Sequence, residues 1–162
     1  DLDIWLTPAP ERRLTRAERE QTGAASMVAA DRKSVNSRFT PAHAQVLRAA
    51  AEDPAVARIF VNAAIKAELC RQGPEDWMRK LRPWWGHDAH FHVRLDCPAG
   101  EGACIGQAPP PPGPGCDETL AWWFSDEALN PRPKPGAKPR GPLTLADLPG
   151  ECRAVLDSPA AR

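Results

Sequence analysis

The stretch Trp84–Leu95, with the sequence WWGHDAHFHVRL, contains three of the four histidines of this 162-residue chain. From His90 onward polar and apolar residues alternate, which is the side-chain period of a β-strand with one buried face. The polar face carries His90, His92 and Arg94. The opposite face carries apolar residues, namely Phe91, Val93 and Leu95. We therefore predict a strand that holds two imidazoles about 7 Å apart at their Cα atoms, within reach of one metal or proton-transfer site.

Loose metal binding without a biological role is the alternative explanation of such a run, because a histidine is often only a half-buried polar aromatic residue. The alternation with Phe, Val and Leu favours a built site, since a solvated histidine tract would lack it. The fourth histidine, His43, lies in a predicted helix over residues 42–52 that opens with a proline in its first turn. We expect His43 to be a surface or capping residue and not a ligand.

The composition limits the number of domains and the classes of binding partner. With 162 residues and 42% hydrophobic content, the chain can form one compact domain plus a tail, but not two domains of comparable size. Its 21 basic and 21 acidic residues balance, and no basic stripe interleaves with aromatic residues. Nucleic acid and an anionic membrane surface are therefore not expected as partners. No apolar run is long enough to span a membrane, so we expect no membrane span.

Prolines, of which the chain has 19, gather in residues 108–115 and 130–142. Neither segment can form a regular helix or a central strand. The first is bracketed by Cys104 and Cys116, which indicates an ordered, stapled loop, and the second is predicted to be extended. The chain is thus predicted to divide into three parts: a folded region over 1–128, a Pro-rich extended segment over 129–144, and a C-terminal segment over 145–162 that docks through Cys152.

Other patterns predict the remaining elements. Residues 1–6 alternate acidic and apolar side chains, which predicts a half-buried strand with Asp1 and Asp3 facing the site. Thr15 and Glu18 form a possible capping box. Further elements are expected as a helix at 42–52, a strand at 58–62, a helix at 63–70, a helical turn at 77–81, and an aromatic segment at 120–124 packed on the core. Strands and helices without βαβ alternation predict an α+β fold with a mainly antiparallel sheet and flanking helices.

The five cysteines have no Cys-x-x-Cys spacing, so a zinc knuckle or a thioredoxin-like redox site is not indicated. Disulfide bonds in an oxidising compartment are the better interpretation. An odd number leaves one cysteine that is either free or bonded to a partner outside the chain.

An aspartate and an imidazole on neighbouring strands are two of the three protein ligands of a usual catalytic zinc site, and Asp3 and His92 fit these two positions. Several motifs occur together in order: Asp3-Ile4-Trp5, the strand RIFVN at 58–62, Arg82-Pro83-Trp84, the pattern HxxHxHVRL at 87–95, and Cys97-Pro98. On these motifs the chain resembles the penicillin-insensitive murein endopeptidases. That family is grouped with lysostaphin-type peptidases and D-Ala-D-Ala metallopeptidases in a zinc superfamily, and the resemblance covers nearly the whole chain.

The resemblance implies a role for each matched residue. His92 and Asp3 correspond to ligands of Zn²⁺. His90 corresponds to a catalytic base or transition-state stabiliser, and His87 to a further active-site histidine that assists proton transfer or holds substrate. Asp31 matches the aspartate of an additional metal site, but Ser34 stands where that site has its histidine. The resemblance therefore supports one zinc more strongly than two.

The resemblance also implies disulfides and a missing segment. Cys97 pairs with Cys104, Cys70 pairs with Cys116, and Cys152 pairs with a cysteine ahead of residue 1. The remaining zinc-ligand histidine of the family stands seven residues ahead of the aspartate matched by Asp3, which also falls before residue 1. We therefore expect a fragment of a longer exported, periplasmic protein, and we expect this fragment alone to be inactive.

The activity that the resemblance implies is hydrolysis of the D-alanyl to meso-diaminopimelyl cross-link of peptidoglycan, with zinc as cofactor and peptidoglycan peptide cross-links as partners. Penicillin would not inhibit it because no serine acyl-enzyme forms. A non-catalytic peptidoglycan-binding or structural module with the same fold is the alternative, and a D,D-carboxypeptidase is a third possibility. The sequence leaves open whether the protein is a homodimer.

Two further groups of residues admit two interpretations each. Arg94 is placed to hold a carboxylate of the substrate, or it is a structural ion-pair partner. Four tryptophans could line a groove for a glycopeptide: Trp84, Trp85, Trp122 and Trp123. Core packing is expected for at least two of them, since adjacent residues of a strand point to opposite faces.

Overall fold

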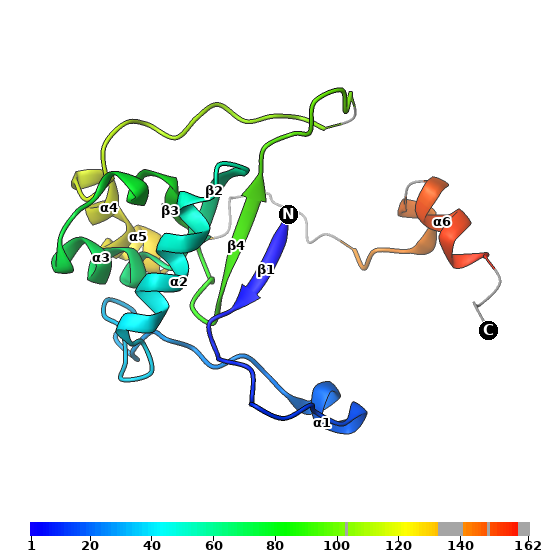
Figure 1. Ribbon diagram of the computed structural model, residues 1–162, viewed down its shortest axis with the longest axis horizontal. Helices are drawn as coiled ribbons and strands as arrows, with labels where there is room; N and C mark the ends of the chain where they lie inside the picture. The colour runs from blue at the N-terminus through cyan, green and yellow to red at the C-terminus, as the bar shows by residue number, and fades with distance from the viewer. Residues whose placement is uncertain (103, 133–140, 149, 159–162) are drawn as a thin grey trace. The chain divides into compact units, whose positions relative to one another are not determined.

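A computed structural model describes residues 1–102, 104–132, 141–148 and 150–158 (Figure 1). The chain forms two compact units, Asp1–Pro131 and Arg132–Arg162. The first unit contains the sheet and the core. No helix in the described residues is both long and apolar enough to cross a membrane.

The first unit is built on a four-stranded sheet in the order β1-β4-β2-β3. The strands are β1 (Leu2–Trp5), β2 (Val56–Val61), β3 (Leu81–Pro83) and β4 (His90–Leu95). β4 pairs antiparallel with β1 and with β2, whereas β2 and β3 are parallel. The predicted α+β class with a mainly antiparallel sheet is confirmed. β4, the strand with the histidines, lies between two neighbours, so its backbone is paired on both edges.

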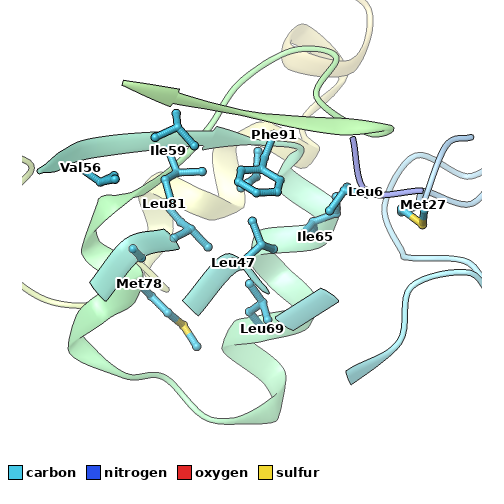
Figure 2. Packing of buried hydrophobic residues seen from close by; sticks show 13 residues of the cluster. Leu6, Met27, Leu47, Val56, Ile59, Ile65, Leu69, Met78, Leu81 and Phe91 are labelled. Atoms are coloured by element: carbon cyan, nitrogen blue, oxygen red, sulfur yellow. The ribbon is translucent and has the colours of Figure 1, made fainter. Parts of the chain in front are cut away.

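One face of the sheet packs on two helices, α2 (Pro41–Glu52) and α3 (Ala63–Gln72). Figure 2 shows Phe91 and Ile59 of the sheet directed toward Leu47 of α2 and Ile65 of α3. Phe91 is 0% exposed, and burial of one such side chain contributes about 1.5–3 kcal/mol. The alternation predicted for β4 is confirmed in its first residues. Its last residue is an exception, since Leu95 is exposed where the strand runs past the core.

The start of α2 explains the fourth histidine. The backbone N–H of Thr40 donates to Nδ1 of His43 at 3.0 Å, so His43 caps the helix. Because Nδ1 accepts, Nε2 carries the proton and donates to the carbonyl oxygen of Leu6 at 2.9 Å. The capping role is confirmed, but the expected surface position is wrong: His43 is 8% exposed, and its two hydrogen bonds satisfy a buried ring. The predicted capping box of Thr15 and Glu18 begins α1 (Arg16–Gln21).

β1 differs from the prediction in its burial. Its apolar side chains Leu2 and Ile4 are 53% and 38% exposed, and only Leu6, just after the strand, is buried. The physical reason is its position: β1 is an edge strand, and the core cluster contains Leu6 but neither Leu2 nor Ile4. The pairing of β1 with β4 nevertheless has the register Asp3↔His92, which sets the geometry of the site.

Two disulfides fix the loop after β4: one closes its first residues on themselves, and the other ties its end to α3. Cys97 is bonded to Cys104, and Cys70 of α3 is bonded to Cys116, which are the pairs that the resemblance implies. The loop is also fastened by Lys66 of α3, which is 0% exposed and donates to the carbonyl oxygens of Met78 and Pro114. The proline-rich stretch is therefore attached to a core helix at its far end.

Short helical turns complete the first unit. The turn predicted at 77–81 is the 3-10 helix η1 (Asp76–Lys80), and the chain beyond Cys116 forms α4 (Glu118–Ala121), η2 (Trp122–Phe124) and α5 (Asp126–Leu129). Leu120 is buried, but Trp122 is exposed. Trp123 and Phe124 are half-buried but are not among the residues packed against the core cluster, so the expected packing of these aromatic residues on the core is wrong.

The second unit contains η3 (Leu145–Asp147) and α6 (Gly150–Leu156). Cys152 of α6 is exposed and has a free thiol. Residues 133–140 of the predicted Pro-rich extended segment lie outside the described residues.

Candidate active site

The pairing of β1 with β4 places the side chain of His92 between two carboxylates. Its Nδ1 lies 2.7 Å from Oδ1 of Asp3, at hydrogen-bond distance. Its Nε2 lies 3.3 Å from Oδ2 of Asp1. Both ring nitrogens of His92 therefore face an acidic group on the neighbouring strand.

His90 and His87 lie beside this pair. Nε2 of His90 is 3.8 Å from Oδ1 of Asp3, so one carboxylate faces both histidines of β4. The ring of His87 lies 4.9 Å from that of His90 and 6.3 Å from that of His92, measured between centroids. All three histidines predicted to form a site are thus brought together on one face, with Asp3 among them.

A tight turn holds His87 in place. His87 has φ 51°, and Gly86 before it has φ 66°, which is the left-handed region that glycine adopts without strain and other residues rarely adopt. Two hydrogen bonds from Asn62, at the end of β2, hold the turn: its N–H donates to the carbonyl of His87 and its Nδ2 to the carbonyl of Gly86, both at 2.9 Å. Such an unusual conformation, held by its surroundings, is typical of a functional residue.

Phe60 of β2 lies under the histidines. Its ring centroid is 5.8 Å from that of His92 and 6.2 Å from that of His87. Since Phe60 and His92 are cross-strand partners, the apolar ring is fixed next to the imidazole by the register of the sheet.

Asp31 makes its described contacts within its own loop. Its carboxylate accepts hydrogen bonds from the backbone N–H of Lys33 at 2.9 Å and from the N–H of Ser34 at 3.1 Å, as well as from the Ser34 hydroxyl. These bonds hold the pKa of Asp31 below its usual value. The side chain therefore stabilises a turn in which Arg32 has φ 59°.

Asp3 and His92 fit zinc by the type of their donors, because carboxylate oxygen and imidazole nitrogen are ordinary ligands of this ion. They do not fit by number. In the described part of the chain, no group of three or more His, Cys, Asp or Glu side chains is arranged to hold a metal ion. A complete site of this kind needs one more protein ligand than this pair supplies.

A cavity of about 280 Å³ lies next to the turn that carries His87. Gly86 and Asp88, its neighbours on both sides, contribute to the lining together with Trp84, Trp85 and Trp123. The expectation that at least two of the four tryptophans pack in the core is wrong. Trp84 and Trp85 are 49% and 45% exposed because the chain leaves β3 at Pro83, so they do not alternate as strand residues.

Two arginines on the site face were not identified from the sequence. Arg58 is the cross-strand partner of Arg94, and Arg82 is the partner of Phe60, so the three arginines and the histidines of β4 share one face. For Arg58 the signal was present, since it alternates with the buried Ile59 as His92 alternates with Phe91. For Arg82 it was absent, because a three-residue strand shows no period.

Three histidines and a carboxylate on an open sheet face, beside a cleft, are an arrangement typical of hydrolases. Comparison with known proteins is more specific. The family model described as "Penicillin-insensitive murein endopeptidase" matches residues 1–157. The chain belongs to this family.

Individual relatives agree with the family model. The chain is 46% identical over 160 residues to a penicillin-insensitive murein endopeptidase of Klebsiella pneumoniae, with 97% of this chain and 56% of the relative covered. Identity to proteins of the same name is 42% in Yersinia enterocolitica, over 98% of this chain and 56% of the relative, and 40% in Haemophilus influenzae, over 100% and 55%. The chain thus spans just over half the length of these relatives.

Proposed function

We propose that this chain carries the active site of a zinc-dependent murein endopeptidase that hydrolyses the D-alanyl to meso-diaminopimelyl cross-link of peptidoglycan in the periplasm and is insensitive to penicillin. The observation that carries the proposal is the pairing of Asp3 with His92 at 2.7 Å, with His90 and His87 beside it. Membership of the family supports the choice of substrate.

Asp3 and His92 are the residues of this chain that would hold zinc, and the resemblance implies a histidine as the third ligand, which the described residues do not supply. When bound, zinc supplies activation of a water molecule and polarisation of the scissile carbonyl. Asp1, 3.3 Å from Nε2 of His92, adds negative charge beside the ligand and orients its ring.

His90 and His87 would move protons. Because the carbonyl oxygen of Trp85 can only accept a hydrogen bond, Nδ1 of His87 carries a proton and donates to it at 2.8 Å. Nε2 of His87 is then the atom that exchanges a proton with substrate, and we assign it the protonation of the leaving amine. His90, whose Nε2 lies 3.8 Å from the Asp3 carboxylate, would accept a proton from the attacking water or stabilise the oxyanion.

A non-catalytic peptidoglycan-binding module is the second candidate. The observation that favours it is the incomplete donor set, since the described residues supply two ligands where a catalytic zinc site has three. Two ligands bind zinc weakly, and a fold that keeps the cleft could still bind glycopeptide.

The test uses the full-length protein encoded by the gene, with zinc measured by elemental analysis and cross-linked muropeptide dimers as substrate. We expect about one zinc per chain and conversion of dimers to monomers. His92→Ala should lose the metal, whereas His90→Ala should keep it and lose turnover, by about 10²- to 10⁴-fold. Asp76→Asn is the matched control, because Asp76 is exposed and outside the site, and it is expected to change neither metal content nor turnover.

Each other outcome selects a different function. Release of free D-alanine instead of monomers would identify a D,D-carboxypeptidase. Absence of both tight zinc and cleavage would leave the binding module as the better hypothesis. Retained turnover in His90→Ala would remove the role assigned to that residue.

A further inference from the structure

Three arginines lie next to the histidines on the site face of the sheet. Arg94 is two residues beyond His92 on β4, which places their Cα atoms about 7 Å apart. Arg58 of β2 is the cross-strand partner of Arg94, and Arg82 of β3 is the partner of Phe60. Phe60 in turn pairs with His92, so Arg94 and Arg58 are register neighbours of His92, and Arg82 lies one strand further, beyond Phe60.

These guanidinium groups have few partners. Arg58 donates from Nη2 to the carbonyl oxygen of Ala108 at 2.6 Å, and Arg94 donates from Nη2 to that of Ile105 at 3.0 Å. The Nε of Arg58 is buried without a hydrogen-bond partner. In the described ranges no carboxylate lies within 4.0 Å of any of the three arginines, although six other cationic side chains form such pairs.

Such a cluster is unfavourable on electrostatic grounds. Burial, together with the charges of Arg82 and Arg94, lowers the pKa of Arg58. The charge of Arg82 contributes to the lowered pKa of Asp117, but it is the smallest of the causes. Partly buried like charges without a counterion oppose folding. Holding the loop through the carbonyls of Ala108 and Ile105 uses one of the five N–H groups of Arg58 and one of those of Arg94, so most of their donors have no role in the loop. Binding of an anion would relieve this repulsion and use the remaining donors.

We propose that Arg58, Arg82 and Arg94 form the subsite for a substrate carboxylate, the one on the carbon that bears the leaving nitrogen. This inference rests on the proposed endopeptidase function. In a D-alanyl to meso-diaminopimelyl cross-link, the released nitrogen is attached to a carbon that also carries a free carboxylate. That group is the negative charge closest to the scissile bond, and the arginines lie on the same face of the sheet as His92.

The subsite makes the enzyme selective for the chemistry of the cross-link. A cross-link to diaminopimelate whose carboxylate is amidated, or to the side-chain amine of lysine, presents no negative charge at this position. We therefore expect the arginines to distinguish these substrates, whereas the histidines act on all of them in the same way.

The experiment compares two synthetic cross-linked peptides that differ only in this group, carboxylate against carboxamide, with the full-length protein. The wild type should have a kcat/KM about 10- to 100-fold higher for the carboxylate, as expected for a charge-assisted bidentate contact. Arg94→Gln and Arg58→Gln should reduce this ratio toward one, mainly through KM for the carboxylate peptide. Arg94→Lys should keep part of it, since the charge remains.

Loop anchoring alone predicts a different pattern. If Arg58 and Arg94 only hold the carbonyls of Ala108 and Ile105, their loss would affect both peptides equally and leave the ratio unchanged, which would overturn the subsite. Arg13→Gln is the matched control, because Arg13 is exposed in a segment outside the sheet and should alter neither peptide.

A binding measurement separates this inference from the proposed function. The affinities of His90→Ala for both peptides are measured by calorimetry, alone and combined with Arg94→Gln. A preference for the carboxylate that disappears with Arg94→Gln supports the subsite, even if the wild type cleaves neither peptide and the endopeptidase proposal fails. Equal affinity for the two peptides, or no binding of either, overturns the subsite.

Discussion

The two faces of the four-stranded sheet are built from alternate residues of the same strands and have opposite character. Toward α2 and α3 the strands present Phe91, Val93 and Ile59, all of them 3% exposed or less. On the other face they present histidines and arginines that are partly exposed. Stability and chemistry are therefore encoded at neighbouring positions, and substitutions one residue apart in β4 should separate the two properties.

The largest effect on stability is expected on the core face. Phe91→Ala removes a ring that is fully buried between the sheet and the helices, and should lower the free energy of unfolding by about 3–5 kcal/mol. Urea unfolding measures the change. Phe91→Leu is the control, since it keeps most of the volume and should cost much less. A small effect of Phe91→Ala would mean that the core face does not hold the sheet.

The second largest loss of stability is expected from the disulfide between α3 and the loop. This bond joins a core helix to the loop near the arginines. Cys70 and Cys116 close a separation of 46 residues, and replacing both by serine should cost about 4 kcal/mol. The Cys97 and Cys104 pair closes only 7 residues and should cost about 1–2 kcal/mol less, by the same chain-entropy argument. Equal losses in thermal or urea unfolding would contradict this argument.

Lys66 is an exception on the core side, a cation buried among apolar groups, and its effect depends on pH. Burial, and to a smaller extent the charge of Arg82, lower its pKa from 10.5 to about 8, and this value includes the opposing effect of Asp117. Between these two pKa values the unfolded chain binds more protons than the folded chain. The free energy of unfolding should therefore rise with pH across this window, by about 3 kcal/mol, while below about pH 8 the cost of burying the charge is present in full.

Lys66→Met provides the comparison for this pH effect. The variant has no ammonium group to titrate, so its free energy of unfolding should lack the rise that the wild type shows between about pH 8 and 10.5. Urea unfolding at pH values below, within and above the window measures both proteins. Parallel pH profiles would show that Lys66 is not responsible.

The smallest effect on stability is expected one residue away from Phe91. His90→Ala removes a partly exposed ring on the site face and should change the free energy of unfolding by less than about 1 kcal/mol, although the same substitution is expected to abolish most turnover. Urea unfolding and the muropeptide assay on one preparation measure both. A large loss of stability would show that the two faces are not independent.

The sequence predicts those parts of this arrangement that depend on local period. The alternation from His90 to Arg94 identifies the histidine face, and the motif around Asp3 identifies its partner. What it misses depends on which strands become neighbours. The exposure of Leu2 and Ile4 follows from the edge position of β1, and the contribution of Arg82 follows from the parallel pairing of a three-residue strand with β2. Neither feature can be predicted from the alternation of polar and apolar residues within one segment.

The alternation of β4 also determines which changes of length the gene can tolerate. Deletion or insertion of one codon between His90 and Val93 would exchange the faces of the strand, turning imidazoles into the core and an aromatic ring toward the substrate. Both stability and chemistry would fail together, which no single substitution is expected to achieve. Codons for residues 8–14, which form no strand or helix and are mostly exposed, should vary in number far more freely.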